Sequence, residues 1–242
     1  MSFLYHTFIY EPLYNGIVAL ADLLPALDAG VIIILFTIIV KLVLFPISKK
    51  AVRTQAMMKL VEPELNAIKE KYKNDKQAQA LHTMNFYKEK KINPFSSIFL
   101  LFIQLPILFA LYRIFYTGFA TIDTDLLYSF VSAPIAIDTL FLGIISVTSK
   151  SWIMALIAAV SQYFQIKLSA PTLPPKKDKP SFSDDFARNM QVQMKYVLPV
   201  VIFFISYHIA SALAIYWATS NIFTIGQELF VRKQLAREGL KK

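Results

Sequence analysis

The sequence has 242 residues, of which 56% are hydrophobic and only 17% are charged, and its mean hydropathy is +0.50. Soluble domains contain about 45–50% apolar residues, so the composition indicates an integral membrane protein. With 25 Lys and Arg against 16 Asp and Glu, the net charge of +9 favours basic cytoplasmic loops over a nucleic-acid-binding fold, and the lack of cysteine excludes disulfides and thiolate chemistry.

The first 29 residues contain no Lys or Arg, and their charges are Glu11, Asp22 and Asp28. They also lack the basic region and cleavage site of a signal peptide. We therefore predict an external N-terminal segment over 1–29. Within it, residues 13–27 are typical of an amphipathic helix that lies at the membrane interface.

Five apolar segments predict membrane-spanning helices, and they cover 30–48, 95–116, 152–168, 196–208 and 211–230. The 18 residues 30–47 of the first reach about 27 Å at ~1.5 Å per residue, close to the ~30 Å thickness of the hydrocarbon core. Pro106 should kink the second span. The apolar stretch from 196 to 230 is too long for one span, so we divide it at its polar interruption, SYHIAS (206–211).

The positions of Lys and Arg predict the orientation, because these residues stay on the cytoplasmic side of short loops. Segment 49–94 carries 11 of them, 167–195 carries 6 and the sequence from 228 carries 5. The external segment 117–151 has one, Lys150. We predict an external N-terminus and a cytoplasmic C-terminus, with a cytoplasmic loop over 169–195 that is flexible at 171–185 and a basic tail at 231–242.

Segment 49–94 predicts a cytoplasmic helical hairpin. Apolar residues recur every three or four positions along its first half, and residues 73–75 should form the turn, with Asn74 or Asp75 as the next helix N-cap. Pro63 should bend the first helix. The two apolar stripes should pack on each other, and the hairpin is also compatible with a mobile platform that touches incoming chains or the membrane surface. The stripes comprise Met57, Val61, Leu65, Ile68 and Tyr72 on the first helix, and Leu81, Met84 and Tyr87 on the second; Met58 lies beside the first stripe.

Lys41 is the one charge deep within a predicted span, where a lysine costs about 2.5–3.5 kcal/mol on insertion scales. One interpretation is that its ammonium reaches the headgroups at the cytoplasmic end. The other is a wet cavity lined by polar groups of the other spans. We expect no acidic partner within the spans, so the cation in such a cavity would suit an acidic ligand. The polar candidates are Gln104, Gln162, Ser220, Asn221 and Gln227, with Trp217 nearby.

Each polar candidate also has a simpler interpretation. Gln104 and Gln162 would serve equally well as hydrogen bonds between helices, and Trp217 as a packing residue. Three scattered histidines and six isolated glycines predict no metal site, no phosphate-binding loop and no cofactor. The residues alone thus predict a five-span bundle, and they leave both positions of the Lys41 ammonium open, at the headgroups or in a polar cavity.

Several segments, in order, resemble the YidC/Oxa/Alb family of membrane protein insertases. The match lies in the first span, the hairpin, the second span and the last span, where IQLPILFALYRIF resembles the pattern IQxPIFxALY and SALAIYWATSNIFTIGQE resembles SGLxLYWxxSNxxxxxQQ. The family usually has arginine where Lys41 stands. The matching segments are 32–51, 61–95, 103–115, 164–172, 190–200 and 211–228.

The resemblance implies an all-α integral membrane protein of the bacterial plasma membrane, with a five-span bundle, a cytoplasmic helical hairpin and a polar groove. It implies an insertase, not an enzyme, that inserts and helps fold nascent membrane proteins without ATP hydrolysis. Lys41 would attract acidic residues of the substrate, while Gln104, Gln162 and Asn221 would keep the groove wet. The implied partners are single- and double-span substrates with acidic tails, the ribosome, the lipid bilayer and the Sec translocon, without direct nucleic-acid readout.

A small transporter or channel for an anionic solute is the alternative that we keep. Its polar interior would be the same, with Lys41 binding the solute. The lack of inverted repeats and of paired intramembrane charges counts against it.

Overall fold

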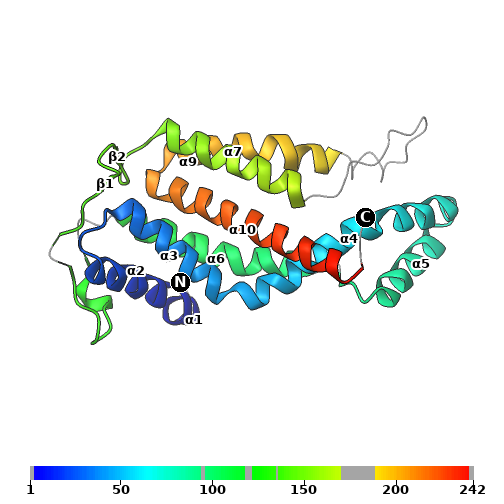
Figure 1. Ribbon diagram of the computed structural model, residues 1–242, viewed down its shortest axis with the longest axis horizontal. Helices are drawn as coiled ribbons and strands as arrows, with labels where there is room; N and C mark the ends of the chain where they lie inside the picture. Colours follow the sequence, from blue (N-terminus) through cyan, green and yellow to red (C-terminus); the bar gives the residue numbers. More distant parts are fainter. Residues whose placement is uncertain (1–2, 94–95, 118–121, 135, 170–188, 240–242) are drawn as a thin grey trace.

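The computed structural model describes residues 3–93, 96–117, 122–134, 136–169 and 189–239. The fold is mainly α-helical, as predicted from the sequence. It is elongated, with the β-strands at one end, called here the β end, and α4 and α5 projecting at the other, the α5 end (Figure 1). The predicted flexible loop, 171–185, lies outside the described residues.

The elements follow in chain order. The helices are α1 (Phe3–Tyr5), the π-helix η1 (His6–Tyr10), α2 (Glu11–Leu23), α3 (Ala29–Val43), α4 (Phe45–Lys71), α5 (Lys76–Glu89), α6 (Ser96–Thr117), the 3-10 helix η2 (Thr124–Leu126), α7 (Trp152–Ser169), the π-helix η3 (Gln193–Val197), α9 (Leu198–His208) and α10 (Ser211–Arg237). The strands β1 (Leu140–Phe141) and β2 (Ile145–Ser146) form an antiparallel pair.

The helix predicted over 30–48 breaks at Leu44. There α3 ends and α4 begins, and the two helix axes differ by 74°. Pro46 explains the break, because it has no N–H to donate to Leu42 and its ring clashes with that carbonyl group. Pro46 fits the first turn of α4 instead, where N–H groups lack partners. By contrast, α4 and α6 continue through Pro63 and Pro106.

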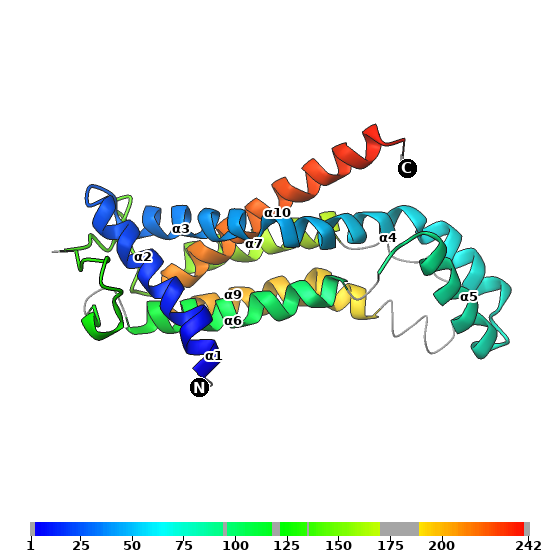
Figure 2. The ribbon, with the colours of Figure 1, turned by 90° about the horizontal axis from the view of Figure 1, so that it is seen from below.

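Helix α10 is the central element of the bundle. It contacts α3, α4, α6, α7 and α9. Figure 1 shows it between α7 and α9 on one side and α3 and α6 on the other, and Figure 2 shows its C-terminal half leaving the bundle at an angle. The main apolar core lies at the β end, between α2, α3, α6 and α10, and contains Ile17, Ile33, Leu111 and Leu213. A second cluster joins α10 to α7 and α9 through Ala214, Ala158 and Ile202.

Helix α2 has one face in the main core, although we predicted an interfacial helix over 13–27. It ends at Leu23, and its buried residues include Tyr14, Ile17 and Val18. The buried Asn15 accepts a hydrogen bond from the backbone of Tyr128 and donates to Leu126, so it holds the following loop against α2. The N-terminal segment is therefore packed against α3 and α6.

Two helices extend beyond the predicted spans. A helix runs from Asn189 through η3 to His208, seven residues before the predicted start at 196. Likewise α10 continues past 230 to Arg237, because Val231 and Leu235 bury against Val52 and Ala56 of α4. Arg53 pairs with Glu238 beyond the end of α10 and holds the pKa of that carboxyl below its usual range.

Among the described residues, one helix is long and apolar enough to cross a bilayer by itself, Asn189–His208. The bent pair α3 and α4 passes the same test only when taken together. Exposed apolar side chains line α7 and α9, where they include Leu156, Ile157, Val200 and Phe204. These faces have the character of surfaces that contact lipid.

Candidate functional site

The ammonium group of Lys41 on α3 points to a neighbouring helix of the bundle. Its Nζ donates a hydrogen bond to Oε1 of Gln104 on α6, at 3.3 Å. Gln104 in turn donates through Nε2 to the hydroxyl oxygen of Tyr216 on α10. This chain of contacts, called here the lysine cluster, matches the interpretation of a polar interior around Lys41. Tyr216 is the member that our candidate set left out.

A second polar cluster joins α7 and α10 around Gln162. Trp217 Nε1 donates to Gln162 Oε1 at 2.8 Å, and Asn221 Nδ2 donates to the same oxygen at 3.2 Å. Asn221 also donates to the hydroxyl oxygen of Ser161 at 3.0 Å. Gln162 and Asn221 are both buried, so this glutamine cluster satisfies polar groups that would otherwise be costly inside the protein.

Gln227 lies apart from both clusters, nearer to the α5 end. Its Nε2 donates to the hydroxyl oxygen of Ser48 on α4, at 2.8 Å. Ser220 is buried on α10 and is a hydrogen-bond neighbour of Tyr216. The structure therefore brings the predicted residues together through α10, but in separate groups of contacts.

The helical repeat of α10 explains this separation. Trp217, Asn221 and Glu228 lie on one side of the helix, since their spacings are four and seven, and they face α7. Tyr216 and Gln227 meet α6 and α4 instead. One helix thus carries two polar stripes between its neighbours.

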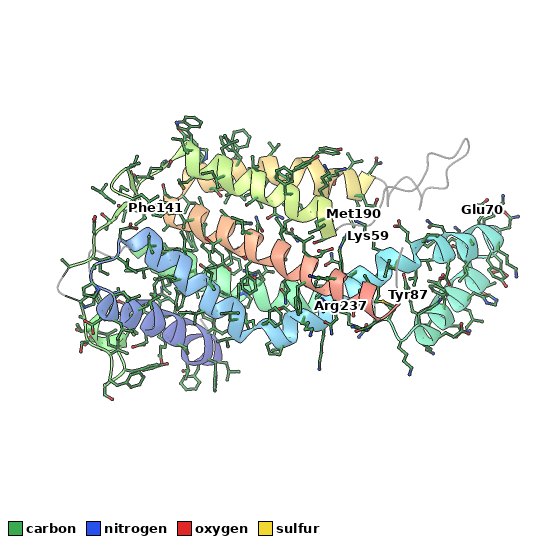
Figure 3. The ribbon with its side chains drawn as sticks, in the orientation of Figure 1. Lys59, Glu70, Tyr87, Phe141, Met190 and Arg237 are labelled. Atoms are coloured by element: carbon green, nitrogen blue, oxygen red, sulfur yellow. The ribbon has the colours of Figure 1, made fainter. Side chains whose placement is uncertain are left out.

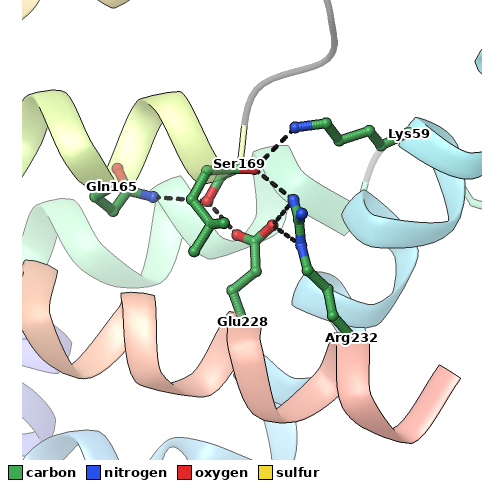
Figure 4. A network of polar contacts seen from close by, with 6 residues as sticks. Lys59, Gln165, Ser169, Glu228 and Arg232 are labelled. Atoms are coloured by element: carbon green, nitrogen blue, oxygen red, sulfur yellow. Dashed lines mark hydrogen bonds and ion pairs between the residues drawn. The ribbon is translucent and has the colours of Figure 1, made fainter. Parts of the chain in front are cut away.

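Glu228 is 1% exposed and forms the centre of a third group, shown in Figure 4. Its carboxylate accepts from the Ser169 hydroxyl and from Arg232, whose Nε lies at 3.0 Å. Arg232 and Lys59 of α4 also donate to the carbonyl oxygen of Leu168. That carbonyl is in the last turn of α7, where helices lack internal partners and cations are favourable. This carboxylate cluster fastens the end of α7 to α10 and α4.

The expectation of no acidic residue within the spans was wrong, because Glu228 falls inside the predicted span 211–230. The structure pairs it with Arg232 rather than Lys41. Glutamate and arginine four residues apart on a helix are a recognisable pair in a sequence. Our boundary at 230 separated them.

The predicted hairpin residues take different positions. Met57 and Met58 pack on the cluster of Val61, Leu65, Phe86 and Ile92, and Tyr72 stacks on His82 with ring centroids 4.1 Å apart. Asp75 is the N-cap of α5, as expected, and accepts from two backbone N–H groups. Pro63 lies within the continuous α4.

Of the predicted apolar stripe of α5, only Tyr87 packs on the cluster that includes Val61 and Leu65 of α4. Phe86 is buried instead, whereas Leu81 and Met84 are 60% and 59% exposed. Tyr87 is partly buried beside this cluster, and burial raises the pKa of its phenol. The three-residue spacing of Leu81, Met84 and Tyr87 is equally compatible with an outward face, so a sequence pattern does not reveal which face packs.

Comparison with known proteins shows which family the sequence matches. Residues 20–238 match the family model described as 60Kd inner membrane protein. The membrane protein insertase YidC of Fusobacterium nucleatum is 31% identical over 206 residues, which are 85% of this chain and 86% of that protein. YidC of Clostridium tetani is 33% identical over 211 residues, covering 86% and 84% of the two chains.

Other relatives are longer than this chain. YidC of Tolumonas auensis is 32% identical over 236 residues, which are 98% of this chain but 38% of that protein. The similarity therefore covers nearly all of the sequence described above, including every residue of the three polar clusters.

Proposed function

This chain belongs to the 60Kd inner membrane protein family, and from that premise we propose that it is a membrane protein insertase of the inner membrane. Its named relatives are insertases, and the similarity covers most of this chain. Nascent membrane proteins are its substrates. The relatives' names favour this function over an anion transporter.

The arrangement in the membrane is a finer part of the proposal. We propose five spans built on α3, α6, α7, α9 and α10, with the β end outside and the α5 end in the cytoplasm. The exposed apolar faces of α7 and α9 support the spans, and the basic residues of 49–94 support the orientation. The short α3 would continue into α4 at the cytoplasmic boundary.

The single observation that carries the mechanism is the position of Lys41. Its ammonium is held among α3, α6 and α10 by Gln104 rather than directed away from the bundle. At 4 Å, opposite charges attract by about 1 kcal/mol in water but about 4 kcal/mol at an effective dielectric constant of 20. Lys41 would therefore attract an acidic residue of a translocating tail into a polar groove between these helices.

The remaining candidate residues would complete that groove. Gln104 beside Lys41, and Gln162 and Asn221 between α7 and α10, offer amides that would exchange hydrogen bonds with a passing polar chain. Trp217 lies with the group that faces α7, whereas Ser220 and Gln227 add polar groups on the sides of α10 toward Tyr216 and α4. Such groups lower the cost of moving a hydrophilic segment through hydrocarbon. The apolar helix of the substrate would leave beside α7 and α10, and its burial in lipid would drive insertion without ATP hydrolysis.

The hairpin of α4 and α5 would receive the substrate from the ribosome. Leu81 and Met84 offer exposed apolar contacts there, and methionine adapts to varied apolar partners. The Sec translocon is a further partner in this proposal.

The test is rescue of cells depleted of their own insertase. Lys41→Glu should abolish insertion of a single-span substrate with an acidic tail, because the reversed charge repels that tail, whereas Lys41→Arg should preserve it. Each variant is first quantified in the membrane, so that loss of protein is distinguished from loss of function. Full activity of Lys41→Glu would disprove the attraction mechanism.

Crosslinking locates the path of the substrate. A photoreactive residue at position 104 or 217 should capture a stalled nascent chain, and one at the buried Ile17 of α2 should not. Flux of an anionic solute in liposomes without insertion would instead support a transporter.

A further inference from the structure

The β-hairpin at the β end has a base that is fixed to two helices. Ala29 N, at the start of α3, donates to the Asp138 carbonyl at 2.7 Å. Ala212 N, at the start of α10, donates to the Val147 carbonyl at 2.9 Å. Val147 itself is fully buried. The hairpin therefore has a definite position relative to the bundle.

Side-chain packing holds the same base. The ring of Phe141 lies so close to Gly30 that a Cβ there would be 2.2 Å from Phe141 Cδ2. Figure 3 labels Phe141 at this end of the molecule, far from Arg237. Asp28 both caps α3, through the N–H of Val31, and accepts a hydrogen bond from Leu142 N at 3.2 Å.

The tip of the hairpin, by contrast, is apolar and exposed. Leu140, Leu142 and Ile144 are 45%, 65% and 79% exposed, and no charged residue occurs between Asp138 and Lys150. Turns at water-facing tips are usually rich in Asn, Asp, Ser and Gly. Leu142 has φ of 52°, a left-handed conformation that is unfavourable for leucine. The fold thus holds an aliphatic side chain outward at a conformational cost.

The surroundings of the tip indicate what covers it. Trp152, which is 60% exposed, begins α7 shortly after the hairpin, and the exposed apolar residues of α7 follow it. Tryptophan is enriched where a membrane meets water. The tip has aliphatic side chains without the aromatic and arginine anchors that dominate protein interfaces. The tip therefore has the composition of a surface that contacts lipid rather than protein.

We propose that Leu140, Leu142 and Ile144 form a lipid-binding tip that enters the headgroup and upper acyl region of the leaflet at the β end. Because the base of the hairpin is hydrogen-bonded to the starts of α3 and α10, binding of the tip to lipid would also restrict the movement of those two helix ends. The occupant is phospholipid, and the contact exists in the resting protein, so its test is independent of insertase activity.

The experiment uses the natural absence of cysteine in this chain. Ile144→Cys and, separately, Leu142→Cys are labelled with the fluorophore NBD in the full chain and reconstituted in phosphatidylcholine–phosphatidylglycerol vesicles. Nitroxide lipids labelled near the headgroup should quench both labels, and their emission should shift to shorter wavelength. The control is Asp125→Cys in η2, an exposed acidic position that should be quenched by aqueous iodide instead.

A charge in the tip supplies the second measurement. Ile144→Lys, combined with the label at 142, should abolish lipid quenching, whereas Asp125→Lys with the same label should leave it unchanged. Iodide quenching without lipid quenching at both labelled positions would overturn the proposal. Protection from both quenchers would also overturn it, because it would place a protein partner on the tip.

Discussion

At the residue scale, two charges are held inside the bundle by different means. Lys41 has a neutral amide as its hydrogen-bond partner, so its positive charge is not neutralised by that contact. Glu228 has a cation, a hydroxyl and almost no exposure to solvent. Glu228 therefore serves structure, whereas Lys41 is the residue that we propose to meet the substrate.

Replacement of Glu228 by glutamine should destabilise the protein by about 1–3 kcal/mol, because it removes the charge-assisted bonds of a buried group. The measurement is unfolding in detergent micelles. The matched control is Glu70→Gln, whose partner Lys73 is an exposed residue of the same ion-pair type. That change should cost under about 1 kcal/mol. Equal stability of the two variants would contradict the role assigned to the carboxylate cluster.

At the element scale, the boundaries of helices depend on different physics. The bounds of α6 and α7 lie within a residue of the predicted 95–116 and 152–168, because the length of an apolar segment follows the bilayer. The end of α3, Val43, does not coincide with the predicted end of the first span at 48, since apolar residues continue through the break at Leu44. Helix α10 extends beyond the predicted span 211–230 for the opposite reason, because its packing on α4 is a contact between distant segments.

Which residues belong to the candidate site could be predicted from the sequence better than which of them are in contact. Polar residues in apolar segments are visible in a sequence, and Trp217 and Asn221 on α10 do meet Gln162. The α10 partner of Gln104 is Tyr216, which the candidate set left out. The partner of Gln227 is Ser48, which lies 179 residues away, and no sequence pattern predicts a contact between them. The β-hairpin was also missed, because strands of two residues are too short for alternation to be recognised.

The contact of α3 with the hairpin predicts an unusual effect of a small substitution. Gly30→Ala should destabilise the protein by about 1–3 kcal/mol, because the new methyl group overlaps Phe141 at its Cβ as well as its ring. Adding Phe141→Ala should recover part of the loss. Unfolding in micelles measures both variants.

Gly226→Ala is the control for that measurement, because no atom lies within 4 Å of a Cβ at this position of α10. There the change should be neutral or stabilise the helix by up to about 1 kcal/mol. A Gly30→Ala variant that behaves like Gly226→Ala would show that the hairpin does not pack on α3.

The docking of α10 on α4 gives another prediction for an element. Leu235→Ala should cost about 2–5 kcal/mol, since this side chain is 1% exposed beside Val52 and Ala56. Limited proteolysis should then cut the end of α10 faster than in the parent. Lys233→Ala, at an exposed position two residues earlier, should change stability by less than about 0.5 kcal/mol. Equal cutting of the two variants would argue against the docking.

At the scale of the whole molecule, the proposed orientation separates the two ends of the bundle by a membrane. A cysteine at position 125 should react with an impermeant maleimide added to intact cells. One at position 74, in the turn between α4 and α5, should react only after the membrane is opened. The reverse pattern would contradict an external N-terminus and a cytoplasmic C-terminus.

The central position of α10 has a consequence for the order of assembly during translation. Helices α3, α4, α6, α7 and α9 all contact α10, yet they precede it in the chain and leave the ribosome first. Until α10 has been synthesised, these helices lack the partner that they share, and the glutamine and carboxylate clusters lack the residues that α10 contributes. Pairings between segments far apart in a chain form slowly. The protein that we propose to assist other nascent chains therefore passes, during its own synthesis, through a stage in which these helices have not yet made their contacts with α10.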